Sequence, residues 1–198
     1  MLRAVLFDMD GVLVDSFEAW LRLMNATASH FGCSPVGRGR FRAVYGQPTE
    51  KDAEAFFPGH TVKEIETFYD AHFTEYTEFV HADPAASEVV ASLRQRGVRT
   101  AVVTNTLSAL ARRILGEAGI EPDAVVGAND VPHAKPAPDM VHRACDLLGV
   151  LPSEALMVGD SQYDREAATK AGARFAGLGI DGDDRLQQLA DVLALVGH

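Results

Sequence analysis

The chain has 198 residues, of which 47% are hydrophobic and 23% charged, the composition of a folded globular protein with one domain or one domain plus an insertion. Its formal net charge of −10 disfavours nucleic acid and anionic membrane surfaces as partners, and the densest basic stretch, residues 37–42, is expected to be a solvated turn. The two cysteines lack the spacing of zinc ligands, and the short apolar run at the start resembles neither a signal peptide nor a membrane anchor, so a cytoplasmic protein is expected.

Short apolar runs without alternation predict strands that are buried on both faces of a parallel sheet. Between them, apolar residues at helical spacing predict amphipathic helices, and a closing helix is expected to use Leu186 and Leu189. Strands alternate with helices from about residue 84 onward, which predicts a doubly wound, Rossmann-like α/β sheet. The predicted strands are residues 4–7, 100–103, 124–126, 155–158 and 174–178.

Residues 16–80 interrupt this alternation, because they contain no buried-strand run and two helical stripes that begin near Phe17 and Ile65. The sequence therefore predicts an α/β core domain made of residues 1–15 and 81–198, with an all-helical domain inserted at residues 16–80. The insertion follows the carboxyl end of the first strand, where ligands of open α/β sheets bind. Bending between the two domains is expected at the two connecting segments.

Four carboxylates follow predicted strand ends, although they are far apart in the sequence. Asp8 and Asp10 follow the first strand, and Asp160 and Asp164 follow the strand at residues 155–158. Because the carboxyl ends of parallel strands share one edge, these side chains should meet in one crevice. Like charges at close range need a cation, and hard oxygen ligands suit Mg²⁺.

Lys135 stands before Pro136 and Pro138, which stiffen the backbone that follows it. A fixed ammonium beside a carboxylate cluster is the counter-charge that a bound phosphoryl group needs. Thr104 and Asn105 also follow a strand end, after residues 100–103.

Taken together, the segments DMDGVLVDS (residues 8–16), VVTNT (102–106), KPAPDM (135–140) and VGDSQYD (158–164) resemble the four motifs of the haloacid dehalogenase-like phosphohydrolase superfamily. They match in order and spacing over nearly the whole chain. The helical insertion is similar to the cap that one subgroup carries between its first and second motifs. The resemblance therefore implies an α/β core with an inserted helical cap.

The resemblance also implies a mechanism. Asp8 would be the nucleophile that becomes an aspartyl phosphate, and Asp10 would be the general acid that later activates water as a base. True dehalogenases lack the second aspartate of the first motif and need no metal. The presence of Asp10 and Asp160 therefore points to phosphate esters as substrates.

Further site residues follow by the same resemblance. Thr104, the backbone N–H of Asn105, and Lys135 would bind the phosphoryl oxygens. Mg²⁺ would be held by the carboxylates of Asp8 and Asp160 and the backbone carbonyl of Asp10. Asp164 would help to hold the metal or would orient the lysine.

The cap should choose the substrate, a small phosphorylated metabolite. The cap segments resemble those of phosphoglycolate phosphatases and their pyrophosphatase relatives, in which a Gly-x-Pro turn faces the site; here that turn is Gly46, Gln47 and Pro48. Arg42 is the nearest candidate for pairing with a substrate carboxylate, and a solvent-facing arginine is an equal alternative.

Other functions stay open at this point. A mutase similar to β-phosphoglucomutase is disfavoured because Trp20 stands where that branch carries a histidine, and Tyr45 and Thr49 flank the cap glycine region where it carries basic residues. An inorganic pyrophosphatase is another alternative. A receiver-type phosphoacceptor module would be smaller, would lack the insertion, and would carry its acceptor aspartate after a middle strand.

Overall fold

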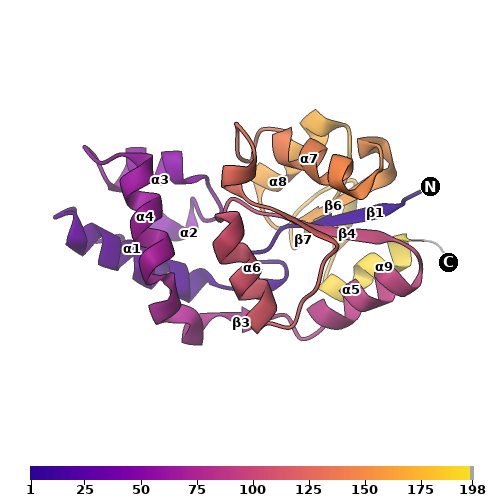
Figure 1. The fold of residues 1–198 in the computed structure, drawn as a ribbon, viewed down its shortest axis with the longest axis horizontal. Helices are drawn as coiled ribbons and strands as arrows, with labels where there is room; N and C mark the ends of the chain where they lie inside the picture. The colour runs from indigo at the N-terminus through magenta and orange to yellow at the C-terminus, as the bar shows by residue number, and fades with distance from the viewer. Residues whose placement is uncertain (197–198) are drawn as a thin grey trace.

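The computed structural model describes residues 1–196, and its centre is a six-stranded parallel sheet (Figure 1). The strand order is β5-β4-β1-β6-β7-β8, so the first strand in the sequence lies in the middle. The strands are β1 (Ala4–Phe7), β4 (Arg99–Val103), β5 (Ala124–Val126), β6 (Ala155–Gly159), β7 (Arg174–Leu178) and β8 (Asp184–Leu186). This confirms the predicted doubly wound α/β class.

The end of the chain differs from the prediction. Leu186, expected on the face of a closing helix, lies in the edge strand β8, where it pairs with Leu178 of β7. Only after this strand does the chain turn helical, first in the 3-10 helix η4 (Leu189–Asp191) and then in the short α9 (Val192–Leu195). The strand β8 has the sequence Asp-Arg-Leu, in which Leu186 is the one apolar residue, so it leaves no apolar run in the sequence.

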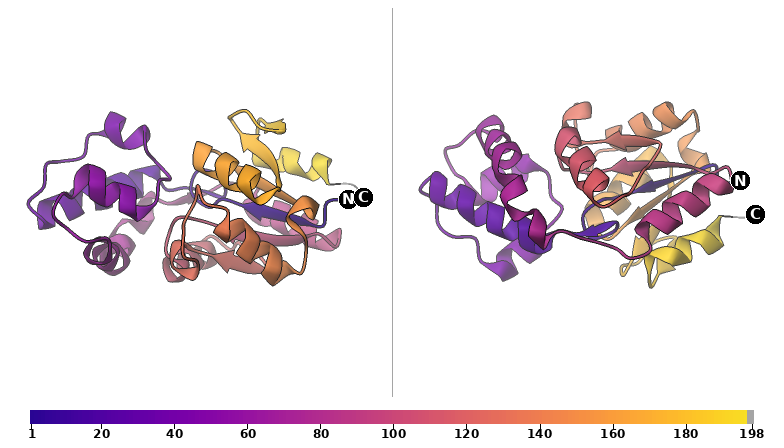
Figure 2. Two further views of the ribbon diagram at one scale, coloured as in Figure 1. Left: turned by 90° about the horizontal axis from the view of Figure 1, so that it is seen from above. Right: turned by 60° about the horizontal axis from the view of Figure 1, so that its bottom comes forward.

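Helices cover both faces of the sheet (Figures 1 and 2). In β1, Ala4 and Leu6 face one buried apolar cluster and Val5 and Phe7 face the other, as expected for a strand covered on both sides. Helices α7 and α8 pack in the first cluster, and α5, α6 and α9 pack in the second. Their bounds are α5 (Ala86–Gln95), α6 (Ser108–Glu117), α7 (Asp139–Leu148) and α8 (Gln162–Ala171), and the 3-10 turns η2 (Ala128–Asp130) and η3 (Pro152–Glu154) precede α7 and β6.

The segment between β1 and α5 is helical apart from two short strands. Thr61 begins α4 with a capping box, in which its hydroxyl accepts from the backbone N–H of Glu64 and the Glu64 carboxylate accepts from the backbone N–H of Thr61. The elements are β2 (Val14–Asp15), α1 (Phe17–His30), α2 (Arg38–Arg42), α3 (Thr49–Phe56), α4 (Val62–His72), η1 (Phe73–Phe79) and β3 (His81–Ala82). We call residues 16–80 the cap helices.

Residues 37–42, expected as a solvated turn, form the short helix α2 instead. The cause is Phe41, which is only 5% exposed and packs its ring 5.3 Å from that of Phe17. One buried aromatic side chain is enough to fold a basic segment onto the rest of the cap helices.

Two connections join the cap helices to the sheet, and they form an antiparallel pair, β2 with β3 (Figure 2). Val14 pairs with Ala82 and Asp15 with His81, and the N–H of Asp83 donates to the carbonyl of Leu13 over 2.9 Å. The cap helices therefore leave the sheet at the carboxyl end of β1.

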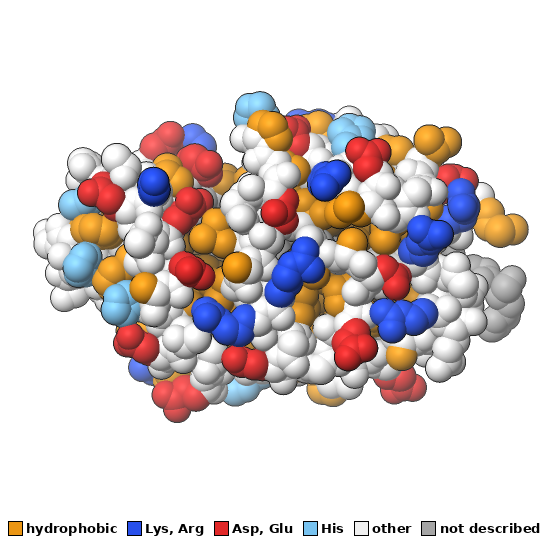
Figure 3. Space-filling model, in the orientation of Figure 1, with side chains coloured by type: hydrophobic (Ala, Val, Ile, Leu, Met, Phe, Trp, Pro, Cys, Tyr) orange, Lys and Arg blue, Asp and Glu red, His pale blue; other side chains and the backbone are white. Residues whose placement is uncertain are grey.

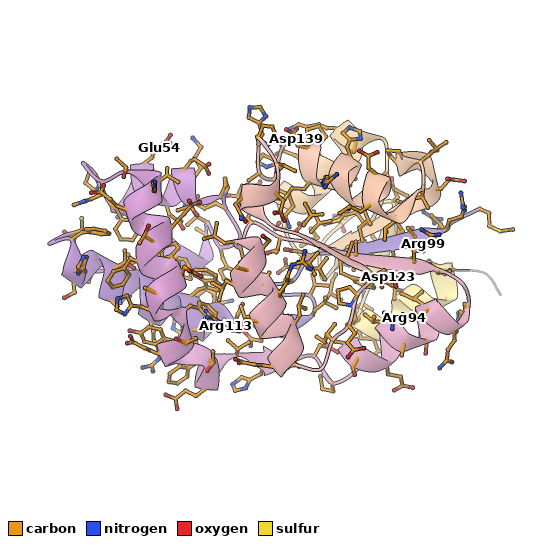
Figure 4. The ribbon with its side chains drawn as sticks, viewed as in Figure 1. Glu54, Arg94, Arg99, Arg113, Asp123 and Asp139 are labelled. Carbon is orange, nitrogen blue, oxygen red and sulfur yellow. The ribbon has the colours of Figure 1, made fainter. Side chains whose placement is uncertain are left out.

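The surface shows no gathering of one charge on the face drawn in Figure 3, where Lys and Arg are interspersed with Asp and Glu. One such pair, Arg94 of α5 and Asp123 before β5, lies 3.5 Å apart at the edge of the sheet (Figure 4). Across residues 1–196, no helix has the length and apolar character that crossing a membrane requires.

Candidate active site

Side chains from three separate strand ends and from the first turn of one helix meet at the carboxyl edge of the sheet. Asp8 and Asp10 follow β1, Thr104 follows β4, and Asp160 follows β6. Asp164 is in the first turn of α8, and ligand oxygens of Asp8, Asp160 and Asp164 lie within 4.8 Å of one another. The topology thus brings together the residues that the sequence analysis selected.

Lys135 lies at the centre of this group and is 1% exposed. Its Nζ is 2.7 Å from Asp8 Oδ1 and 2.6 Å from Asp164 Oδ1, and it also donates to the carbonyl of Val103 over 2.8 Å. Burial opposes the charge of Lys135, but Asp164 and Asp8 outweigh it and raise the pKa of the ammonium above its usual value. Lys135 is therefore a fixed cation beside Asp8.

Asp164 is fully buried and is held by its own helix terminus. Its Oδ2 accepts from the backbone N–H and the hydroxyl of Ser161, over 3.1 and 2.5 Å, while Oδ1 faces Lys135. Of the two roles expected for Asp164, orienting the lysine corresponds to the contact observed.

The carboxylates carry more negative charge than Lys135 offsets. Burial and then Asp164 raise the pKa of Asp8 well above its usual value, with Lys135 acting against them. Burial and Asp164 likewise raise the pKa of Asp160 to about 7. Such a cluster of hard oxygen ligands fits a divalent cation, which would relieve the repulsion.

Gly11 shapes the same corner of the site. Its φ of +86° is a backbone conformation that side-chain-bearing residues rarely adopt, and a Cβ there would lie 2.1 Å from Asp160 Oδ2. The turn after β1 thus lets Asp160 approach the backbone of the first motif.

Asp10 is not one of the three clustered carboxylates, and it accepts hydrogen bonds from both parts of the molecule. From the cap side, Trp20 Nε1 donates to Oδ1 over 3.0 Å, and the Ser16 hydroxyl donates to the same oxygen. From the sheet side, the hydroxyls of Thr106 and Thr104 donate to Oδ2 over 3.0 and 3.4 Å.

Ser16, Trp20 and Thr106 are partners of Asp10 that were not predicted from the sequence. A signal exists for two of them: Ser16, the residue before α1, and Trp20 are four residues apart, so they lie on the same side of the start of that helix. Thr106 has no such signal.

Asn105 links the site to the cap helices through its side chain. Its Nδ2 donates to the carbonyl of Gly46 over 2.9 Å and to that of Lys135 over 3.1 Å, and its Oδ1 accepts from the backbone N–H of Lys135 over 2.9 Å. One amide thus positions both the loop of the cap glycine and the loop of the lysine.

The cap residues selected from the sequence divide into two groups. Gly46 and Gln47 line the pocket above Asp8, and Pro48 precedes the first residue of α3 beside them. Arg42 does not line this pocket: its side chain is exposed and its guanidinium lies 4.3 Å from the ring centre of Phe17.

The fold and this arrangement of carboxylates, lysine and threonine define a hydrolase, and the chain belongs to the haloacid dehalogenase-like hydrolase family, whose model matches residues 5–178. Membership excludes the receiver-type module.

Three similar proteins carry three different names. A pyrophosphatase, PpaX, from Anoxybacillus flavithermus is 25% identical over 99% of this chain and 97% of its own. An N-acetylmuramic acid 6-phosphate phosphatase from Pseudomonas aeruginosa is 31% identical over 88% of this chain and 80% of its own. The crystal structure of a predicted phosphoglycolate phosphatase from Haemophilus somnus superposes with a TM-score of 0.79 at 25% identity and covers 98% of this chain and 97% of that one. Similarity therefore gives the family and the hydrolase class, while the three names differ in substrate.

Proposed function

We propose that this protein is a Mg²⁺-dependent phosphatase that hydrolyses a small phosphomonoester through an aspartyl-phosphate intermediate. The observation that carries the proposal is the placement of Lys135 against Asp8 at one end of the pocket, with Asp10 and its donors beside it. Relatives named phosphatase and pyrophosphatase support the same reaction class.

In the first step, an Asp8 oxygen attacks phosphorus while the bond to the leaving oxygen breaks, and protonated Asp10 gives its proton to that oxygen. In the second step, Asp10 takes a proton from water, the water oxygen attacks phosphorus, and the bond to Asp8 breaks. Lys135, Thr104 and the backbone N–H of Asn105 would hold the phosphoryl oxygens as charge develops on them.

Asp8 and Asp160, with the backbone carbonyl of Asp10, would hold Mg²⁺, and Asp164 stands beside them. When bound, the metal offsets the charge of the carboxylates and of the incoming phosphate. The chain's own residues then orient the ester and move the proton.

We also propose that residues 16–80 act as a cap domain on a core made of residues 1–15 and 81–198. The support is their connection through only two short strands and the few polar links that cross to the sheet, such as Asn105 to Gly46. Closing the cap over the site would exclude water from the phosphoryl group. A phosphorylated metabolite of the cytoplasm is the expected substrate.

The test of the reaction class is hydrolysis of p-nitrophenyl phosphate. We expect Mg²⁺-dependent activity that falls to background in Asp8→Asn, because the amide is a poor nucleophile. Thermal unfolding of the variant serves as the folding control. Full activity in Asp8→Asn, or after complete removal of divalent metal, would contradict the mechanism.

The same assay separates the alternatives. Faster isomerisation than hydrolysis of β-glucose 1-phosphate would identify a mutase, and preferential release of phosphate from pyrophosphate would identify a pyrophosphatase. A phosphoglycolate-like substrate, the finer prediction from the sequence, is supported by the name of one similar structure, but Arg42, the residue expected to pair with its carboxylate, lies outside the pocket.

A further inference from the structure

The pocket above Asp8 extends into the cap helices, where its wall is mostly apolar. Its cavity volume is about 50 Å³ in this structure. The lining continues past the residues proposed to bind the phosphoryl group, so the rest of the substrate would lie against the cap helices. The apolar and aromatic residues on the cap side of the wall are Trp20, Met24, Phe41, Val44, Tyr45 and Tyr69.

One carboxylate, Asp52 of α3, lines this apolar part of the pocket and is only 9% exposed. Its Oδ1 accepts from Gln47 Nε2 over 2.8 Å, and its Oδ2 accepts from the Tyr69 hydroxyl over 3.3 Å. Both partners are neutral, and within residues 1–196 no lysine, arginine or histidine forms an ion pair with Asp52. Burial, opposed by these two hydrogen bonds, raises the pKa of Asp52 to about 7.

A buried carboxylate without a counter-ion is unfavourable unless something supplies a donor. The second hydrogen bond is long, and the Tyr69 hydroxyl also lies 2.8 Å from Met24 Sδ, so its single proton is shared between two acceptors. Asp52 Oδ2 therefore keeps capacity to accept a hydrogen bond from a ligand.

The pocket offers no cation for a second negative charge on the substrate. Among its lining residues in the described part of the chain, Lys135 is the one cationic side chain, and it is already paired with Asp8 and Asp164. A carboxylate or second phosphate that entered the cap side would face Asp52 unpaired, at a large cost in desolvation.

We infer that the substrate is a phosphomonoester whose alcohol portion has an apolar or aromatic body, carries no second negative charge, and presents a hydrogen-bond donor to Asp52. The inference rests on the proposed phosphatase function and names its substrate class. Phosphoglycolate and pyrophosphate, which carry a second anionic group, would be poor substrates.

Three phenyl phosphates test the inference, with methyl, aminomethyl or carboxyl at the para position. The measurement is kcat/KM with Mg²⁺ at a pH of about 8, above the pKa of Asp52. We expect the wild type to use the carboxyl ester at least about tenfold less well than the methyl ester, from the usual cost of an unpaired charge. This ranking opposes intrinsic reactivity, because carboxyphenol is the better leaving group.

Asp52→Asn is then compared with wild type, ester by ester, so that differences between leaving groups cancel. We expect kcat/KM to rise on the order of tenfold for the carboxyl ester, to fall by a similar factor for the aminomethyl ester, and to change little for the methyl ester. The matched control is Glu54→Gln, which removes a carboxylate on the same helix whose side chain points outward (Figure 4) and should leave all three values unchanged.

Both shifts are required. Equal factors for the three esters would mean that Asp52 only holds Gln47 and α3 in place, and would overturn the inference. If Asp52→Asn does not fold, the test is the order of the three kcat/KM values in the wild type. The inference is overturned if the carboxyl ester is not the poorest substrate of the three. Failure of the wild type to hydrolyse even p-nitrophenyl phosphate would instead overturn the proposed phosphatase function.

Discussion

Asp10 is the residue at which the two parts of the molecule meet, because its donors come from α1 on one side and from the segment after β4 on the other. Each oxygen of Asp10 accepts two hydrogen bonds, and both donors to Oδ1 come from Ser16 and Trp20 at the start of α1. The orientation of the carboxyl group is therefore fixed only while α1 is in place. The proposed acid–base residue thus has its full set of donors only with α1 in this position, and under the proposed cap function proton transfer would be tied to the presence of the cap over the substrate.

Asp52, the buried acid on the cap side of the pocket, makes stability depend on pH. Its folded-state pKa of about 7 lies above the usual 3.8, so the folded state binds the proton more tightly and the contribution of Asp52 to stability falls as pH rises from about 4 to about 7. The nearby Glu50 adds to this shift, and Tyr69 and Gln47 oppose it by hydrogen bonding.

Asp52→Asn should therefore be more stable than wild type at pH values above about 7, and the difference in the free energy of unfolding should shrink toward about pH 4. The measurement is chemical unfolding of both proteins across this range, in the absence of substrate. A difference that is independent of pH would show that Asp52 does not titrate in this window.

At the scale of elements, the junction of β6 and α8 holds the lysine in place. Asp164 fits against Gly159 so closely that a Cβ there would lie 2.3 Å from Asp164 Cβ. The absence of a side chain at the end of β6 is therefore what lets the first turn of α8 bring its carboxylate to Lys135. The end of β6, the first turn of α8 and the loop that carries Lys135 are therefore in direct contact here.

Gly159→Ala should displace Asp164, because overpacking of this kind costs about 1–3 kcal/mol of stability. Since Asp164 is an ion-pair partner of Lys135, we expect the displacement to lower kcat by at least about tenfold. The matched control is Gly116→Ala in α6, where a Cβ meets nothing within 4 Å and should add about 0.5–1 kcal/mol of stability. The measurements are kcat and the thermal unfolding of both variants. An unchanged kcat in Gly159→Ala would mean that the added methyl group is accommodated without moving Lys135.

At the scale of the whole molecule, the cap helices and the sheet are joined by two connecting segments (Figure 2). Side chains of the two parts also touch across the pocket. The Tyr45 hydroxyl lies 2.7 Å from that of Ser16, and Asn105 donates to Gly46. Because only a few polar links hold the cap loop at residues 44–48, we expect a ligand bound in the site to change how firmly this loop is held.

We expect amide hydrogen exchange at residues 44–48 to slow when Mg²⁺ and a phosphate analogue such as vanadate are added, because ligand binding favours the docked arrangement. Exchange in β8, at the far edge of the sheet, is the internal reference and should stay constant. Equal exchange at residues 44–48 with and without the analogue would argue against cap closure.

The sequence predicted the sheet, and which polar side chains lie at its carboxyl edge, because both leave strong local signals. The buried strands are continuous apolar runs, and Asp8, Thr104, Lys135 and Asp160 stand directly after or between them in a known order. The short edge strand β8 left no such signal, and Leu186 was placed on a helix instead.

The cap side of the pocket was harder to predict. In α3 the charged residues around Asp52 have the pattern of a solvated helix face, and only the packing of α4 against α3 buries this one carboxylate. Arg42 was selected for its chemistry, but its contact with Phe17 directs it away from the pocket. Both outcomes depend on tertiary contacts that no local pattern encodes.

The position of Trp20 has a practical consequence. It is the only tryptophan in the chain, its indole N–H donates to Asp10, and its ring lies 5.5 Å from that of Tyr69 and 4.9 Å from that of Phe73. Because indole emission depends on the hydrogen bonding and polarity around the ring, the intrinsic fluorescence of the unmodified protein reports on a single place, the junction between α1 and Asp10. The proposed opening of the cap would therefore be measurable by stopped-flow fluorescence during turnover, without attaching a dye.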